Sequence, residues 1–250
     1  INDQNMCKFG ALDIDTYPID HVAILKKCRR FKLPLVVCRS KSGGAHLFLF
    51  TKDWITATDM RDHLTEFAAV LGYGGCEVFP KQNKILAERG DVGNFINLPY
   101  FDSENTLRYA VNEKGEELSL ERFLNYVDRV TTTLEDLRSL DFTSDDDELK
   151  EMPPCLRIMF ATSVPDGTRN KVMFHAAVAA KMMHPDTWEQ TLEKWNQKYC
   201  KPSLPAGEIV TIQNQHKKKE YGYLCKEEPM GSHCDKARCR CNSNVLAWSN

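Results

Sequence analysis

The chain has 250 residues, of which 42% are hydrophobic and 27% are charged, and its net charge is −2. This length allows one large domain or two modest ones, and the apolar content is sufficient for a buried core. No apolar run is long enough to span a membrane and no secretory signal is visible, so we expect a cytoplasmic protein that does not associate with membranes.

Charge and cysteine are unevenly distributed. The first 150 residues carry 25 acidic and 19 basic side chains, a net charge of −6, and the rest carry 14 basic and 10 acidic ones, a net charge of +4. The acidic part suits a divalent-cation site, and the basic part permits a polyanionic partner. Four of the ten cysteines lie within residues 225–241. In a reducing compartment such a cluster binds metal more often than it forms disulfides.

The first half of the chain alternates strand and helix patterns. The predicted elements, in order, are a strand at 7–15, a helix at 18–30, strands at 34–39 and 45–50, a helix at 58–71 and a strand at 76–79. This order is the split βαβ pattern of ferredoxin-like and RNA-recognition-like folds. A loop at 81–93, a strand at 94–98 and a long helix at 118–137 follow. Because the sequence begins almost within a strand, we expect an N-terminal part to be missing.

A charged linker separates this first domain from a second one. We predict an α+β domain over residues 1–142, a linker at 143–152 and a mostly helical domain over 153–250. The second domain contains predicted helices at 171–183, 186–199 and 207–219, and it ends in a short cysteine-rich stretch.

Two aspartates, Asp13 and Asp15, end the first predicted strand. Residues two apart in a strand point to the same face, so their carboxylates would converge on one spot and bind a hard cation there. Glu77, in the last strand of the pattern, could supply a third carboxylate. Two ions held in this way catalyse phosphoryl and nucleotidyl transfer. The alternative is a strand end with solvated acids and, for Glu77, a surface glutamate.

A glycine-rich turn precedes His46, in the sequence Ser-Lys-Ser-Gly-Gly-Ala-His at residues 40–46. Successive glycines allow the backbone N–H groups to approach phosphate oxygens, and the His46 ring could reach a phosphate from the side. Arg39 and Lys41 add positive charge. The alternative is a simple hairpin turn. A later basic loop with Lys81, and a stretch with Asn94 and Asn97, could contact a triphosphate, a sugar or a base.

Taken together, these motifs resemble the archaeo-eukaryotic primase superfamily, and within it the primase–polymerases of phages, plasmids and other mobile elements. LDID at 12–15 resembles the catalytic hhDhD motif, and SKSGGAHLFLF at 40–50 resembles the S-x-H motif. The stretch from Cys76 to Phe101 resembles the third, acidic motif and its trailing strand. All three motifs occur in the family order.

The resemblance implies a template-directed nucleotidyltransferase that makes RNA or DNA primers on single-stranded DNA from nucleoside triphosphates with Mg²⁺ or Mn²⁺. In it, Asp13, Asp15 and Glu77 would bind the catalytic metals. The nucleotide would be contacted by Ser42, Gly44, His46, Lys81 and Asn97. The resemblance also implies a bacterial or archaeal host and a possible helicase domain or subunit as partner.

The second domain resembles the helical C-terminal domain of the primase large subunit, which holds an iron–sulfur cluster through four separated cysteines and helps to position the initiating nucleotide. The matching cysteines here are Cys155, Cys225, Cys234 and Cys239, with Cys241 as an alternative. Four thiolates suit Zn²⁺ or a [4Fe–4S] cluster, and we favour a structural zinc because the late cysteines are compact. The alternative for Cys155 is a buried thiol at a helix start.

Basic and polar residues gather where helices of the second domain begin. A helix start with basic residues binds phosphate on physical grounds. By the resemblance, Arg157, Arg169 and Asn170 could hold the 5′ triphosphate of the initiating nucleotide or the template. The alternative is a capped and solvated helix end.

Two other functions remain as alternatives. A rolling-circle replication initiator or relaxase shares the strand order but needs a His-hydrophobe-His metal pair, which the sequence lacks. A non-catalytic, zinc-stapled nucleic-acid-binding module would explain the cysteines but would leave Asp13, Asp15 and His46 without a role.

Overall fold

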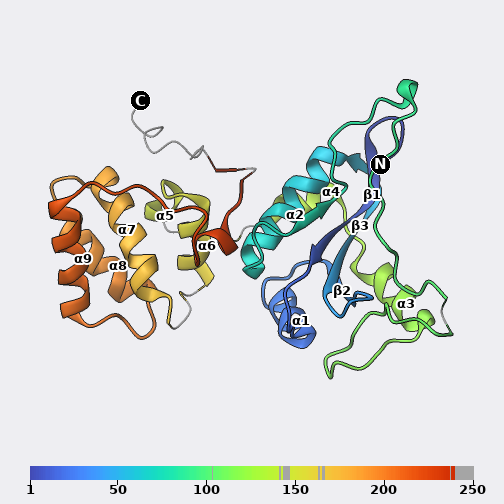
Figure 1. The fold of residues 1–250 in the computed structure, drawn as a ribbon, viewed down its shortest axis with the longest axis horizontal. Helices are drawn as coiled ribbons and strands as arrows, with labels where there is room; N and C mark the ends of the chain where they lie inside the picture. The colour runs from blue at the N-terminus through green and yellow to red at the C-terminus, as the bar shows by residue number, and fades with distance from the viewer. Residues whose placement is uncertain are drawn as a thin grey trace. The chain divides into compact units, whose positions relative to one another are not determined.

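A computed structural model describes residues 1–102, 104–140, 142, 147–162, 164, 167–236 and 238–239. The chain divides into two compact units, residues 1–140 and 141–250 (Figure 1). In the parts of the chain that are described, no helix combines the length and the apolar character needed to cross a membrane.

The first unit is built on an antiparallel sheet of four strands. These strands are β1 (Met6–Ile14), β2 (Leu35–Arg39), β3 (Ala45–Thr56) and β4 (Glu77–Phe79). Their spatial order is β2-β3-β1-β4, so β1 lies in the interior of the sheet. Helix α1 (His21–Arg30) follows β1, and α2 (Ala57–Leu71) follows β3. This is the split βαβ arrangement that the sequence predicts.

One face of the sheet packs on α2 through small and aliphatic residues. A Cβ atom at Gly10 of β1 would lie 2.6 Å from Met60 Cγ and 2.7 Å from Leu64 Cδ1, so this position must be glycine for the helix to approach so closely. Leu12 and Ile14, which share this face by alternation, are fully buried. Asp13, between them, therefore points to the opposite face.

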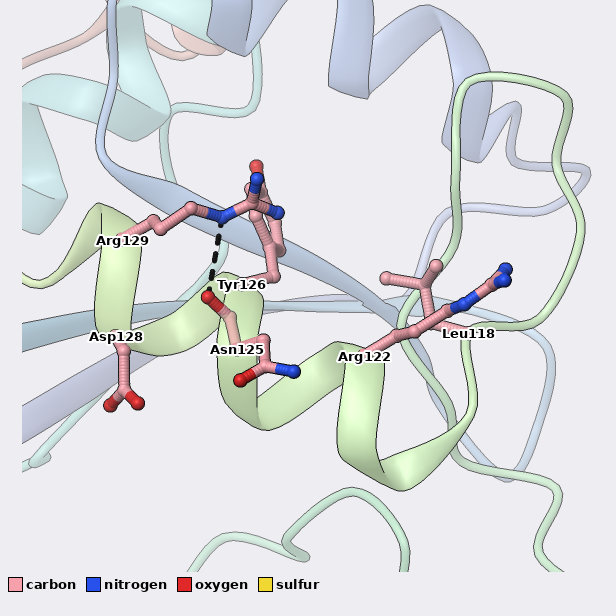
Figure 2. A pocket seen from close by; sticks show the side chains of 6 residues that line it. All are labelled: Leu118, Arg122, Asn125, Tyr126, Asp128 and Arg129. Carbon is pink, nitrogen blue, oxygen red and sulfur yellow. Dashed lines mark hydrogen bonds between the residues drawn. The ribbon is translucent and has the colours of Figure 1, made fainter.

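The opposite face of the sheet is partly covered by residues that follow β4. Ala11, Val36 and Phe48 form a buried cluster with Tyr100 and Phe123 from this covering part. Helix α3 (Leu120–Val130) supplies Phe123 to this cluster. The part of the unit after β4 also contains the 3-10 helix η1 (Ala87–Arg89) and the short helix α4 (Leu134–Ser139). Figure 2 shows α3 from the side that is turned away from the sheet.

Two predicted elements of this covering part are wrong. The predicted strand at 94–98 is irregular, because the Asn94 N–H donates to Gln82 Oε1, 3.3 Å away, instead of joining a ladder. The predicted helix at 118–137 is two helices. Three threonines interrupt it, Thr132 forms a bridge to Thr51 of β3, and Thr133 caps α4 with a capping box. β-Branched threonines favour extended backbone and N-caps over helix interiors.

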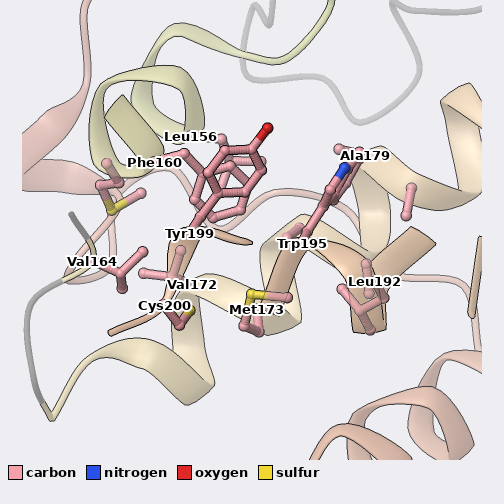
Figure 3. Packing of buried hydrophobic residues seen from close by; sticks show 14 of the residues in the cluster. Leu156, Phe160, Val164, Val172, Met173, Ala179, Leu192, Trp195, Tyr199 and Cys200 are labelled. Carbon is pink, nitrogen blue, oxygen red and sulfur yellow. The ribbon is translucent and has the colours of Figure 1, made fainter. Parts of the chain in front are cut away.

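The second unit is helical in the residues described. Its helices are α5 (Asp147–Lys150), α6 (Pro154–Thr162), α7 (Arg169–Met183), α8 (Trp188–Tyr199), α9 (Ala206–Lys218) and the 3-10 helix η2 (Gly231–His233). Their core is aromatic: Phe160 stacks on Tyr199 with ring centroids 4.5 Å apart, and the fully buried Trp195 packs edge-on against Phe160 (Figure 3). The Trp195 indole N–H donates to Glu148 of α5, which ties that short helix to α8.

Candidate active site

The acidic centre of the site lies at the C-terminal end of β1. Asp13 is paired across the sheet with His46 of β3 on one side and with Glu77 of β4 on the other. His46 Nε2 lies 3.2 Å from Asp13 Oδ1. That contact lacks hydrogen-bond geometry, and Oδ1 is buried without a hydrogen bond from any described residue. A buried carboxylate oxygen without a donor is an incomplete environment that a cation would complete.

Asp15 lies one residue beyond the end of β1 and is held by a tyrosine. The Tyr17 hydroxyl donates to Asp15 Oδ1 at 2.9 Å and also hydrogen-bonds to Ser42 Oγ at 2.7 Å. Ser42 Oγ in turn lies 3.0 Å from Ser40 Oγ. A chain of hydroxyl groups therefore connects the second aspartate to the glycine-rich turn.

The glycine-rich turn is packed directly against the end of β1. A Cβ atom at Gly44 would lie 2.6 Å from the Ile14 carbonyl oxygen and 3.2 Å from Asp15 Oδ1, so only glycine allows this approach. The ring of His21, at the start of α1, hydrogen-bonds through Nε2 to the Gly44 carbonyl oxygen at 2.9 Å. The turn therefore lies directly beside the end of β1 that carries the two aspartates.

A cavity of about 400 Å³ opens between the aspartates and the turn. It is lined by Asp13, Asp15, Ser40, Lys41, Ser42, His46, Asn97 and Arg108. Carboxylates that suit a hard cation thus face hydroxyl, ammonium and guanidinium groups that suit phosphate oxygens. The cavity can hold a polyphosphate together with a divalent cation.

The family of the chain follows from comparison with family models. The model described as TOTE conflict system, Archaeo-Eukaryotic Primase domain, matches residues 1–133. The chain belongs to this archaeo-eukaryotic primase family. The matched segment covers more than half of the chain and includes the cavity. No curated protein matches the chain. Proteins of this family are generally nucleotidyltransferases of the primase or polymerase type, and their domains typically use divalent metals.

Two residues of the site have no signal in the sequence. Arg108, which lines the cavity, lies in an irregular segment twelve residues before the start of α3. Tyr17, which contacts the lining residues Asp15 and Ser42, is an ordinary residue of the turn after β1. A basic residue in a loop and a tyrosine before a proline are too common to indicate a site. Arg39, by contrast, braces the turn from outside: its guanidinium donates to the carbonyl oxygens of Leu107 and Ser40.

Glu77 and Lys81 are placed beside the cavity and not within its lining. Glu77 is opposite Asp13, but its carboxylate pairs with Lys81 Nζ at 2.8 Å and its side chain is 58% exposed. Its charge acts on the neighbouring Cys76 thiol. Burial, followed by the negative charges of Asp13 and Glu77, raises the pKa of the Cys76 thiol to about 12. The role of Glu77 as a metal ligand therefore stays a prediction.

Asp13 and Asp15 fit a magnesium or manganese ion by their chemistry. Among the described residues, no three His, Cys, Asp or Glu side chains are arranged as a ready-made metal site. Mg²⁺, however, is commonly bound by one or two carboxylates, with substrate phosphates completing its coordination. A pair of aspartates beside a phosphate-binding turn matches that pattern.

The predicted cysteine ligands of the second unit are related through Cys155, but the four described thiols do not form a ready-made metal site. Cys155, at the start of α6, is buried, and the pKa of its thiol is raised by burial and then by the charges of Cys239, Cys225 and Cys234. Helix α6 also packs against η2, which directly precedes Cys234. No disulfide joins the cysteines that the structure describes, and Cys241 lies outside the described residues.

The polar residues predicted to bind an initiating nucleotide contact other parts of the second unit. Asn170 donates to Glu208 of α9 at 2.8 Å, and the Arg169 guanidinium donates to the Pro202 carbonyl oxygen. Arg157 Nε is buried, with no hydrogen-bond acceptor among the described residues. These contacts tie α7 to its neighbours, and the nucleotide-binding roles stay predictions.

Proposed function

We propose that the chain is a primase–polymerase that joins nucleoside triphosphates on a single-stranded DNA template. The observation that carries this proposal is the cavity in which Asp13 and Asp15 face the Ser40–Gly44 turn together with Lys41 and Arg108. Family membership supports the class of chemistry and counts against the rolling-circle and non-catalytic alternatives. The experiment below also establishes whether the product is RNA or DNA.

The residues divide into two groups by charge. Asp13 and Asp15 would hold the divalent cation, which supplies charge neutralisation at the reacting phosphate and lowers the pKa of the attacking hydroxyl group. Lys41 and Arg108 would bind the triphosphate oxygens, and Ser40 and Ser42 would donate hydroxyl hydrogen bonds to them. Such preorganised donors stabilise the charge that develops on the leaving pyrophosphate.

His46 and Asn97 complete the nucleotide site in this proposal. The His46 ring, set beside Asp13 by the register of β1 and β3, would donate to a phosphate oxygen from the sheet side of the cavity. Asn97 lies in the covering segment and presents an amide that suits a sugar hydroxyl or a base. The 3′-hydroxyl of one nucleotide would then attack the α-phosphorus of the next, so no protein nucleophile is required.

Primer synthesis on single-stranded DNA with labelled NTPs or dNTPs, in Mg²⁺ or Mn²⁺, tests this proposal. We expect Asp13→Asn and Asp15→Asn each to lower product formation at least about a hundredfold, because each removes a negative charge from the cation site. Asp53→Asn, an isosteric change at an exposed residue of β3, serves as the control and should retain activity. Full primer synthesis by the Asp13→Asn, Asp15→Asn double variant would overturn the proposal.

We further propose that Cys155, Cys225, Cys234 and Cys239 bind a structural zinc ion. Support comes from the effect of the three tail thiols on the pKa of the Cys155 thiol in α6, and from the packing of α6 against η2, which directly precedes Cys234. Such a site would fix the tail to the helices and contribute directly to the stability of the second unit. A [4Fe–4S] cluster is the alternative that four thiolates allow.

Metal analysis of the purified chain tests the cysteine site. We expect about one zinc per chain, and a lower melting temperature after chelation. Cys155→Ala and Cys225→Ala should each lose the metal, whereas Cys200→Ala, at a buried thiol outside the four, should keep it. Iron in the sample, together with the visible absorption of an iron–sulfur cluster, would favour the [4Fe–4S] alternative over zinc. Wild-type protein that is metal-free and whose stability does not change on chelation would exclude both.

A further inference from the structure

Helix α3 carries a polar stripe on the side that is turned away from the sheet. Arg122, Asn125 and Arg129 are exposed and spaced i, i+3 and i+7, so they share one side of the helix. Tyr126 lies at the edge of this side, because its ring packs partly against the cluster on the sheet face. The inner side holds Phe123, which is buried in the cluster on the sheet face. The stripe is therefore set on a helix whose opposite side is anchored in the domain core.

A second cavity, of about 680 Å³, opens over this stripe (Figure 2). It is lined by Leu118, Arg122, Asn125, Tyr126, Asp128 and Arg129. The lining contains two arginines and one aspartate, so its net charge is +1. The proposed catalytic residues do not take part in it.

The two arginines remain available to a ligand. Arg129 Nε donates to the Asn125 carbonyl oxygen at 3.3 Å, and its guanidinium lies 5.9 Å from the centre of the Tyr126 ring. Both contacts hold the guanidinium beside the Tyr126 ring (Figure 2). Arg122 is exposed and forms no ion pair with a described residue. Their Cα atoms are about 10 Å apart along the helix, so they can contact separate phosphates of one strand.

Backbone pairing connects this cavity to the proposed catalytic site. His46 pairs with Cys38 of β2, Cys38 pairs with Ala110, and the Leu118 N–H donates to the Ala110 carbonyl oxygen at 2.9 Å. Each step is one strand spacing, so Leu118 at the cavity wall lies about 14 Å from His46. A single nucleic-acid strand can span that distance within a few nucleotides.

We propose that the α3 cavity binds single-stranded nucleic acid, with Arg122 and Arg129 on its phosphates. Arginine–phosphate contacts supply affinity that does not depend on base sequence, which suits a template of variable sequence. This inference rests on the proposed function for the identity of the substrate. It adds a site for the strand that is separate from the nucleotide cavity.

Binding of a fluorescein-labelled oligothymidylate to the full chain, followed by anisotropy over a range of salt, tests the proposal. We expect Arg122→Gln, Arg129→Gln to weaken binding about tenfold and to lower the log–log salt slope by about 1.4, the value for two lost phosphate contacts on a single strand.

The control is Lys26→Gln, Lys114→Gln, which makes the same change in net charge at exposed residues outside the cavity. An unchanged salt slope in the arginine variant, or an equal loss of affinity in the lysine control, would overturn the proposed α3 site. Manganese-dependent binding of a nucleoside triphosphate is measured on the same samples and should survive the arginine changes. Wild-type protein that fails to bind the nucleotide would reject the proposed function alone, and the oligothymidylate slopes would still decide the α3 site.

Discussion

The Tyr17 hydroxyl joins two parts of the nucleotide cavity that are distant in sequence. It contacts Asp15, which ends the first motif, and Ser42, in the turn of the second. The tyrosine is half exposed and contributes little to the core. Its value therefore lies in orienting the Asp15 carboxylate and the Ser42 hydroxyl group relative to each other.

Tyr17→Phe should weaken the metal dependence of catalysis without affecting folding. Loss of a hydrogen bond to a carboxylate at a partly solvated position costs about 1 kcal/mol, so the Mn²⁺ concentration needed for half-maximal primer synthesis should rise about fivefold. The free energy of unfolding should remain within about 0.5 kcal/mol of the wild type. Tyr109→Phe provides a matched control, and an equal shift there would contradict an orienting role for Tyr17.

Single residues of the site differ in how far the sequence predicts them. The alternation of side chains along a strand predicts that Asp13 points away from the face packed on α2. The glycines before His46 predict a turn close to a ligand. Arg108 could not be predicted, since its position depends on the path of an irregular segment. The contact between Glu77 and Lys81 also depends on side-chain conformation, which strand order alone does not determine.

The secondary-structure elements show the same division between regular and irregular parts. The order β1, α1, β2, β3, α2, β4 follows from hydrophobic periodicity, because each element buries one apolar face. The covering part after β4 lacks such periodicity. Phe95 illustrates the difficulty: an aromatic in an apolar-looking stretch suggests a strand, yet its side chain is 87% exposed. The threonines between α3 and α4 likewise act through a cap and a bridge that only the folded sheet supplies.

At the scale of the whole molecule, two buried histidines make the second unit sensitive to acid. His175 of α7 is buried in the second unit, and burial, followed by the nearby His216, lowers its pKa from 6.5 to about 4. His216 is itself buried, and burial and Lys181 lower its pKa. Both rings are therefore neutral in the folded unit at neutral pH.

The second unit should lose stability as the pH falls from about 6.5 toward 4. A histidine with a lowered folded-state pKa stabilises the fold fully above its unfolded pKa, and this contribution is lost as the unfolded chain takes up the proton first. For His175 the loss is at most about 3 kcal/mol. Urea unfolding near pH 7 and near pH 5, followed by tryptophan fluorescence, measures it. His175→Leu should reduce this pH dependence, and an identical dependence in that variant would contradict the assignment.

The two aspartates of the nucleotide cavity are held with unequal stiffness. Asp13 belongs to a strand that is paired on both sides, whereas Asp15 follows the last paired residue and is positioned by a single phenol group. One ligand is therefore a fixed anchor and the other can adjust its distance to the ion. Such a pair tolerates cations of different radius, so Mg²⁺ and the larger Mn²⁺ can both be accommodated without any change in the sheet.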